Sequence, residues 1–377
     1  MTARTAAAAA PFTPSADIRP PRSEVGVFGW LSKNLFSSWS NSLLTVLGFY
    51  VIWRVTAGVL DWAVFSAVWS GKDGTACQSA DVGACWPFVA AKFGQFMYGR
   101  YPDAERWRVL LTYALTGGTL LALMVPAIPG KKWAALFGIF VLPVVSWALL
   151  YGGVVGLPRV PTELWGGLLV TLVVATVGIA GSFPIGIVLA LGRRSQMPVA
   201  RWVSIFFIEV VRAVPLITIL FMSSVMLPLF LPEGVSFDKL LRALIGVMFF
   251  SGAYMAETIR GGLQAIPRGQ YEAADSLGLS FSQKMGLIIL PQALKMVIPG
   301  IVNSFVGLAK DTSLVLIIGI FDLLGIVQAG LTDAKWFAPN TAMTGYVFTA
   351  MVFWVICFSI SRYSAWLEVR LSAGDRR

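Results

Sequence analysis

The sequence contains no histidine and only three cysteines among its 377 residues. Histidine is the usual general base and the commonest metal ligand in proteins, so its absence argues against hydrolytic or metal-dependent chemistry on this chain. Charged residues are also scarce, at 13% of the chain, whereas 57% of the residues are hydrophobic. Several hydrophobic runs exceed the roughly 20 residues that a helix needs to cross a bilayer. The composition therefore predicts an all-α, polytopic membrane protein.

The net charge of +10 indicates a membrane topology and not nucleic-acid binding. The basic residues lie in short loops beside hydrophobic runs, which is the positive-inside bias of membrane proteins. With about eight spans, the basic loops and both termini fall on one side, so we expect a multi-pass protein of the bacterial inner (plasma) membrane, surrounded by lipid, in an N-in, C-in orientation. The expected spans are 41–60, 107–127, 133–153, 165–192, 204–231, 239–258, 290–330 (a broken one) and 343–366.

The chain is expected to have three regions. Residues 1–40 are rich in Ala, Pro and Ser and are predicted to form a disordered cytoplasmic tail. Residues 41–155 would hold additional N-terminal spans with a periplasmic loop at 61–106, and 160–370 would form a five-span unit. Cys77 and Cys85 lie in that loop and could form a disulfide in an oxidising compartment, the alternative being two free thiols.

A polar stretch at about 259–291 separates two hydrophobic spans. Pro267 ends the preceding span, because proline is a poor helix continuer. Gly278 stands where a left-handed helix terminus is expected, and Ser280 with Gln283 has the spacing of a capping box. We therefore expect two short helices hinged at Gly278, with apolar residues at the hinge that need a partner. The alternative is an amphipathic loop that lies on lipid headgroups.

Two acidic–basic pairs have the i,i+3 spacing of neighbours on a helix surface: Glu209 with Arg212, and Glu257 with Arg260. The favoured interpretation is a surface ion pair within each helix. The alternative is that these residues bridge between helices and gate the inner mouth of a pore.

The polar stretch resembles the EAA signature of permease subunits in ABC importers. Its flanks, at 257–270 and 303–314, are similar to the polar amino acid (His/Glu/Gln/Arg/opine) permease family, and the resemblance covers about 160–370. Ala213 and Val214 stand before Pro215 where family members usually have Gly-Thr. The added N-terminal spans look most like the general L-amino acid permease subfamily. The residues that match the signature are Glu272, Ala273, Ala274, Gly278, Ile288, Leu290 and Pro291.

This resemblance implies a five-helix type I ABC importer core whose EAA loop forms coupling helices. It also implies three partners: an ATP-binding ABC subunit, a periplasmic amino-acid-binding protein and a second permease subunit, favoured to be a related but different chain. No G-x-x-x-x-G-K-[ST] phosphate-binding loop follows a strand in this sequence. We therefore expect ATP and Mg²⁺ to bind to the partner ATPase, leaving this chain without a cofactor, a metal or a catalytic residue of its own.

A second polar group lies within the hydrophobic stretch 290–330 and is expected to interrupt a broken helix. Charges at that depth are costly and commonly mark a substrate path. An amino acid zwitterion needs a cation for its carboxylate and oxygen atoms for its ammonium group. The alternative is a structural ion pair between Lys310 and Asp311. The candidate path residues are Asn303, Ser304, Lys310, Asp311, Thr312 and Ser313.

The preferred function is thus the permease subunit of an ATP-driven importer of polar or general L-amino acids. A secondary amino acid transporter is one alternative, but it predicts an inverted repeat of hydropathy and no exposed helical loop. The same machinery carrying another small polar solute, such as an opine, is a second alternative. A membrane anchor without transport activity is a third.

Overall fold

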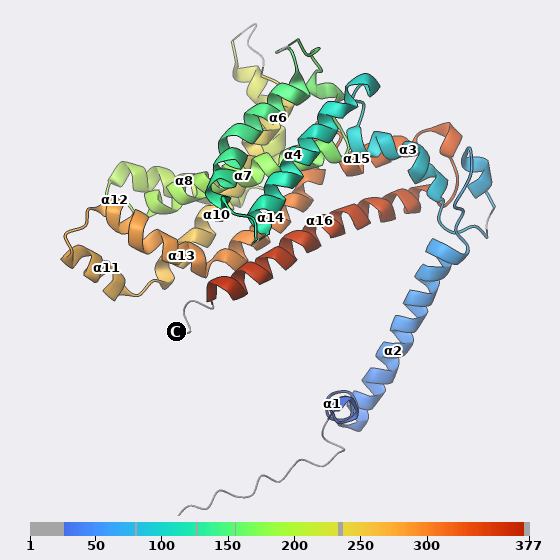
Figure 1. Cartoon of the computed structure of the whole chain (residues 1–377), viewed down its shortest axis with the longest axis horizontal. Helices are drawn as coiled ribbons and strands as arrows, with labels where there is room; N and C mark the ends of the chain where they lie inside the picture. Colours follow the sequence, from blue (N-terminus) through green and yellow to red (C-terminus); the bar gives the residue numbers. More distant parts are fainter. Residues whose placement is uncertain (1–25, 80, 126, 155, 233–236, 373–377) are drawn as a thin grey trace, which may run out of the picture. The chain divides into compact units, whose positions relative to one another are not determined.

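The computed structural model describes residues 26–79, 81–125, 127–154, 156–232 and 237–372 (Figure 1). The chain divides into two units, Met1–Ala67 and Val68–Arg377. Within the described ranges the elements are helices, and the β-pairing amounts to two isolated bridges, Val68 with Cys85 and Gly167 with Asp322. The all-α prediction is confirmed.

The first unit contains two helices, α1 (Gly26–Asn34) and α2 (Trp39–Leu60), and a π-helical turn, Asp61–Phe65, continues α2. Ser38 caps α2, because its side chain accepts a hydrogen bond from the Asn41 backbone N–H. Residues 1–25 of the predicted disordered tail lie outside the described residues. The prediction of disorder is wrong for 26–34, where Val27, Trp30 and Leu31 have the i, i+3, i+4 spacing that favours an amphipathic helix.

The second unit is built around the packed helices α7 and α10, with α14 and α16 packed against each other beside them and further helices at the ends and sides (Figure 1). Its α-helices are α3 (Trp86–Tyr98), α4 (Arg106–Met124), α5 (Lys131–Leu136), α6 (Leu142–Tyr151), α7 (Leu168–Arg193), α8 (Pro198–Ala213), α9 (Leu216–Phe221), α10 (Lys239–Ala265), α11 (Arg268–Ser276), α12 (Phe281–Gln283), α13 (Leu290–Met296), α14 (Ile298–Asp311), α15 (Leu323–Leu331) and α16 (Thr341–Ser372).

Six helices of the described chain are long and apolar enough to cross a membrane, and a bent pair raises the number to seven. The expected count of about eight is therefore one or two too high by this measure. One difference lies at 133–153, which the structure divides into α5, a π-helical segment Phe137–Val141 and α6, and the other is the bent pair within 204–231. The span expected at 239–258 is longer than predicted, because α10 keeps a buried apolar face, including Ile259 and Leu263, until Ala265.

Two expected spans differ in shape. The segment expected at 204–231 forms α8 and a second helical run, Leu216–Phe230, that starts with α9, and the chain bends by 105° between them. Val214 is extended (φ −112°, ψ 137°) because Pro215 disfavours a helical residue before it. The stretch 290–330 is broken, but at Val297 and Gly319 and not at its charged residues. Lys310 is still inside α14, and the chain then continues as a 3₁₀ helix, Thr312–Ile318.

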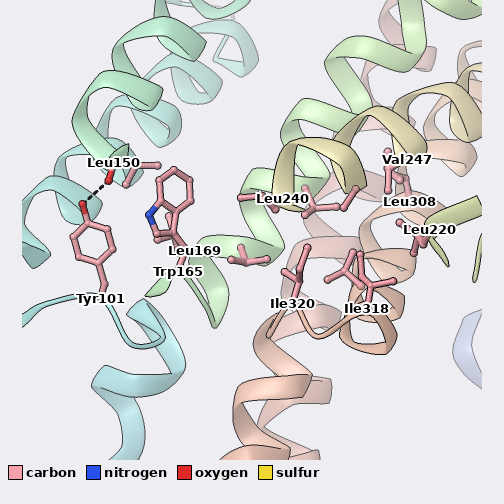
Figure 2. Packing of buried hydrophobic residues seen from close by; sticks show 14 of the residues in the cluster. Tyr101, Leu150, Trp165, Leu169, Leu220, Leu240, Val247, Leu308, Ile318 and Ile320 are labelled. Atoms are coloured by element: carbon pink, nitrogen blue, oxygen red, sulfur yellow. Dashed lines mark hydrogen bonds between the residues drawn. The ribbon is translucent and has the colours of Figure 1, made fainter. Parts of the chain in front are cut away.

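The core of the second unit forms where α7 and α10 pack closely. A methyl group at Gly181 would lie 2.2 Å from the Met248 sulfur atom, and one at Gly252 would lie 2.6 Å from Cγ2 of Ile185. Small residues therefore bring the two backbones together, as is common between membrane helices. Figure 2 shows how this core extends to the N-terminal spans, where the Tyr101 hydroxyl donates to the Leu150 carbonyl at 2.8 Å.

A small lobe formed by the Cys77–Cys85 disulfide and α3 packs against α15 and α16. Cys77 and Cys85 form the disulfide that the sequence left open, and the Cys85 backbone N–H donates to the Thr344 hydroxyl at 2.9 Å. Lys92 of α3 pairs with Asp333 at 2.6 Å, and this hydrogen bond lowers the pKa of the Asp333 carboxyl. Figure 1 shows α3 and α15 at one end of the unit and α11 and α12 at the other.

Candidate functional site

The EAA loop forms two short helices that meet at a glycine. α11 ends at Ser276, and Gly278 follows in the left-handed conformation, with φ +70°. The Leu279 N–H bonds to the Ala274 carbonyl at 3.3 Å, and the Gly278 N–H bonds to the Asp275 carbonyl at 2.9 Å. This pair of bonds is a Schellman motif, which glycine favours because it has no Cβ to clash in that conformation. The predicted hinge is confirmed.

The second helix begins immediately after the hinge. Ser280 and Gln283 form both hydrogen bonds of the predicted capping box. α12 then continues without a break through a π-helical segment, Lys284–Ile289, into α13. Lys284 also pairs with Asp275 across the hinge. Because both helix ends are capped, the loop has a defined shape and is not a flexible connection.

The EAA residues are divided between a buried and an exposed side of the loop. Ala274 is 1% exposed, whereas Glu272 and Ala273 are exposed. Leu277 and Phe281 are 73% and 55% exposed on either side of the hinge. Exposed large apolar side chains that adjoin one another on a protruding loop are typical of a protein-binding surface.

The remaining signature residues belong to the stem of the loop. Ile288, Leu290 and Pro291 lie on the helical run that joins α12 to α13, and the first two pack against a buried cluster that contains Ile259 and Ile289. The stem is close to α10, since a methyl group at Gly262 would lie 2.7 Å from the Ala293 carbonyl oxygen. The loop therefore stands on a tightly packed base.

Glu257 is the centre of an ion-pair cluster that joins α7, α8 and α10. Its carboxylate lies 2.9 Å from Arg193 and 2.8 Å from Arg260. Arg212 lies 3.5 Å from the same carboxylate, and Glu209 pairs with Arg193 at 2.8 Å. The predicted pair within α10 is thus present. On α8 the favoured pair within the helix is not formed. Glu209 pairs with Arg193 of α7 and Arg212 with Glu257 of α10, so these residues bridge between helices as the alternative expected.

Two of the candidate path residues lie on an exposed polar face of α14. Asn303 and Lys310 are exposed and two helical turns apart, and Gly307 between them faces open space. Ile301 and Leu308, on the opposite side of the same helix, are buried. A membrane-spanning helix that exposes an amide and an ammonium group on one face needs a polar or protein neighbour there, because lipid solvates neither group.

The other path residues occupy different positions. Ser304 and Ser313 are half-buried, and their hydroxyls donate to carbonyls of the preceding turn. Thr312 is fully buried and donates to the Ala309 carbonyl at 2.9 Å, so it lies away from the exposed face. Asp311 is half-buried, and among the described residues it forms no ion pair with Lys310. The two residues therefore do not form the close ion pair of the structural alternative.

Three residues that no sequence motif singled out connect these elements: Arg193, Arg194 and Tyr271. Arg194 donates to the Leu263 carbonyl at 2.8 Å and to the Tyr271 hydroxyl at 2.9 Å. The available signal was a pair of arginines at the end of a span, together with a tyrosine directly before Glu272 of the EAA signature. In the part of the chain that the structure describes, no group of three or more metal-ligating side chains could hold a metal ion.

Taken together, the fold and the site define a polytopic helical membrane protein. Its membrane-spanning helix α14 has an exposed polar face, and a capped two-helix loop protrudes from the protein. This is the class of membrane-embedded transport subunits. The family model described as "binding-protein-dependent transport system inner membrane component" matches residues 182–373. The chain belongs to this family, and the matched segment contains the EAA loop, the ion-pair cluster and α14.

Two relatives that match along most of the chain agree with the family. The chain is 52% identical to the inner membrane amino-acid ABC transporter permease protein YhdY of Escherichia coli, over 92% of this chain and 93% of that protein. It is 37% identical to the glutamate/glutamine/aspartate/asparagine transport system permease protein BztC of Rhodobacter capsulatus, over 94% and 96%. A crystal structure of an amino acid ABC transporter with histidines is 29% identical over 54% of this chain and 92% of its own, with a TM-score of 0.48.

Proposed function

We propose that this chain is the permease subunit of an ATP-driven importer of polar or general L-amino acids. Membership of the binding-protein-dependent transport family supports a transport role, and the names of YhdY and BztC support amino acids as the cargo. The observation that carries the mechanism is the capped loop with Leu277 and Phe281 exposed around Gly278. A separate ATP-binding subunit docks there, and its closure moves the transmembrane helices by alternating access.

ATP and Mg²⁺ bind to that partner, and this chain hydrolyses nothing. The proposal is supported by the absence of a phosphate-binding loop from the sequence. A periplasmic amino-acid-binding protein delivers the cargo, and a second permease subunit, a related and different chain, completes the pore. The polar face of α14 supports the need for a second subunit, since Asn303 and Lys310 require a partner or an aqueous path inside the membrane.

The cargo passes along that polar face. Lys310 offers a cation for the carboxylate of an amino acid, and the oxygen atoms of Asn303 and Asp311 offer acceptors for its ammonium group. Ser304 and Ser313 can contribute only after their hydroxyls leave the carbonyls that they bond to now. Thr312 is assigned a packing role at the start of the 3₁₀ segment, because it is fully buried.

The protein lies in the inner membrane with both termini in the cytoplasm. This orientation requires an even number of crossings, so the segment Lys131–Tyr151 must cross in addition to the bent α8–α9 pair. Two features support that crossing. Its three helical segments follow one another without a break, and α5 and α6 both pack along α4 as the second arm of a hairpin. Twenty-one helical residues span about 31 Å at 1.5 Å per residue, which matches the hydrocarbon core of a bilayer.

A secondary transporter is the alternative from another class. It would use an ion gradient and would need no docking loop. Membership of a binding-protein-dependent family and the exposed capped loop both favour the ATP-driven machine. The same machinery carrying opines or another small polar solute remains the second candidate, and competition by such solutes in an uptake assay separates it from the first.

The test is uptake by proteoliposomes that contain the complex purified with its own ATPase and permease partners. In the presence of the binding protein and a mixture of radiolabelled L-amino acids, uptake should require ATP and should persist without an ion gradient. Gly278→Val should abolish uptake while the chain remains inserted, because a side chain at φ +70° is strained and the hinge must change shape. Full uptake and full stimulation of ATP hydrolysis in this variant would contradict the coupling role.

A further inference from the structure

One backbone carbonyl, that of Leu263, receives hydrogen bonds from two other helices. The last four carbonyls of a helix have no partner within the helix, and Leu263 lies in the last turn of α10. Arg194, at the end of α7, donates to this carbonyl at 2.8 Å, and the hydroxyl of Tyr271, on α11, donates to it at 2.9 Å. Three helices therefore meet at a single oxygen atom.

The two donors also contact each other. Arg194 donates a second hydrogen bond to the Tyr271 hydroxyl at 2.9 Å, and its guanidinium carbon lies 5.4 Å from the centroid of the Tyr271 ring. The result is a closed triangle of two side chains and one carbonyl. A planar guanidinium can stack on the ring and donate from the same group, whereas an ammonium group has no plane to stack. The positive charge is also favourable beside the negative end of α10.

Two other polar contacts of α11 stay within the loop and its stem. Gln270 bonds to Gln292 on α13 at 3.2 Å, and Asp275 pairs with Lys284 directly beyond the hinge. The Arg194–Tyr271 contact instead connects α11 to α7, the helix that packs most closely with α10 in the core. A displacement of α11 relative to α7 must therefore stretch or break this triangle.

We propose that Arg194 and Tyr271 form the joint through which movement of the coupling helix α11 reaches α7 and α10. This inference rests on the proposed function, since it assigns a route to the coupling described there. Both are positioning residues, because neither is assigned contact with cargo or nucleotide. In this joint, Tyr271 follows the docked ATPase, and Arg194 transfers the displacement to the ends of α7 and α10.

The experiment measures two quantities on the intact complex in proteoliposomes: ATP hydrolysed and radiolabelled L-amino acid taken up. Tyr271→Phe keeps the ring under Arg194 and removes only the hydroxyl, and Arg194→Lys keeps the charge and removes the planar group. Both variants should lower the uptake per ATP hydrolysed by about fivefold or more, the lower end of typical coupling between two sites. Copurification of the ATPase should not change. Arg201→Ala, an exposed arginine at the start of α8, is the matched control and should keep the wild-type ratio.

A double-mutant cycle then separates a joint from two unrelated packing residues. If Arg194 and Tyr271 act as one unit, the Arg194→Lys, Tyr271→Phe double variant should be no worse than the more affected single variant. Additive losses, or an unchanged uptake-to-ATP ratio in both single variants, would overturn the joint. Failure of the wild-type complex to show ATP-driven uptake would instead overturn the proposed function, so the two failures are distinguishable.

Discussion

Replacing Glu257 should destabilise the protein far more than replacing Glu209. Glu257→Gln and Glu209→Gln make the same chemical change within one ion-pair cluster. Glu257 is 16% exposed and lies within 3.5 Å of three arginines. Glu209 is 56% exposed, and within the described ranges its one ion pair is with Arg193. The comparison therefore isolates burial and the number of partners from the chemistry of the substitution.

The expected magnitudes follow from the exposure of each carboxylate. Breaking a fully buried ion pair costs about 3–5 kcal/mol, and breaking an exposed pair costs about 0.2–1 kcal/mol. Glu257 lies nearer the buried limit, but its arginine partners are 23–34% exposed, so we expect a loss of about 2–3 kcal/mol. Glu209→Gln should lower the free energy of unfolding by less than about 1 kcal/mol. At about 2 °C per kcal/mol for a unit of this size, the shifts in Tm are about 4–6 °C and under about 2 °C.

The assay is thermal unfolding in detergent, followed by the fluorescence of the 14 tryptophans. Glu368→Gln, an exposed glutamate of α16, is the matched control and should leave Tm unchanged. Higher salt should reduce the effect at Glu209 more than the effect at Glu257, because salt screens exposed pairs more strongly. Equal shifts for the two glutamates, or a larger shift for Glu209→Gln, would refute the central place of Glu257 in the cluster.

Three further predictions concern other parts of the molecule. Cys85→Ser opens the Cys77–Cys85 disulfide, whose separation of eight residues corresponds to about 2–3 kcal/mol of lost stability, and thermal unfolding under non-reducing conditions measures the loss. Lys92 lowers the pKa of Asp333, so their contact stabilises the lobe above the ordinary carboxyl pKa of about 3.9 and is lost as the pH falls through the lower, folded-state pKa. The Tm difference between wild type and Lys92→Gln should therefore shrink below about pH 4; a constant difference would contradict the ion pair. Lys310→Met should reduce uptake about tenfold with normal assembly of the complex, and unchanged uptake kinetics would exclude it from the path.

The features that could be predicted from the sequence are those fixed by local chemistry. Gly278 adopts the left-handed conformation that its place after a short helix indicated, and Ser280 and Gln283 form the expected capping box. Both depend on residues within four positions of each other. The bend between α8 and α9 had a local signal as well, since Pro215 forces an extended residue before it, and the expected span ran through that signal.

The features that the sequence did not reveal depend on packing between distant segments. Arg193 and Arg194 have the same composition signal as any basic loop, and their roles appear only when α7 ends beside α8, α10 and α11. Likewise, the run of polar residues from Lys310 to Ser313 does not indicate that Thr312 is fully buried. Which side of α14 faces the core is determined by the neighbours that cover Ile301 and Leu308.

The central claim is that the hinge of the EAA loop is the docking surface for a separate ATPase. The most direct test is the amount of ATPase subunit that copurifies with the Leu277→Asp, Phe281→Asp double variant. Because both side chains are exposed and would be buried only by a partner, we expect the bound ATPase to fall by more than about tenfold, with insertion and Tm unchanged. Gln196→Asp, which adds a charge to another exposed residue at the same end of the unit, should retain the ATPase. Full retention of the ATPase by the double variant would contradict docking at this hinge.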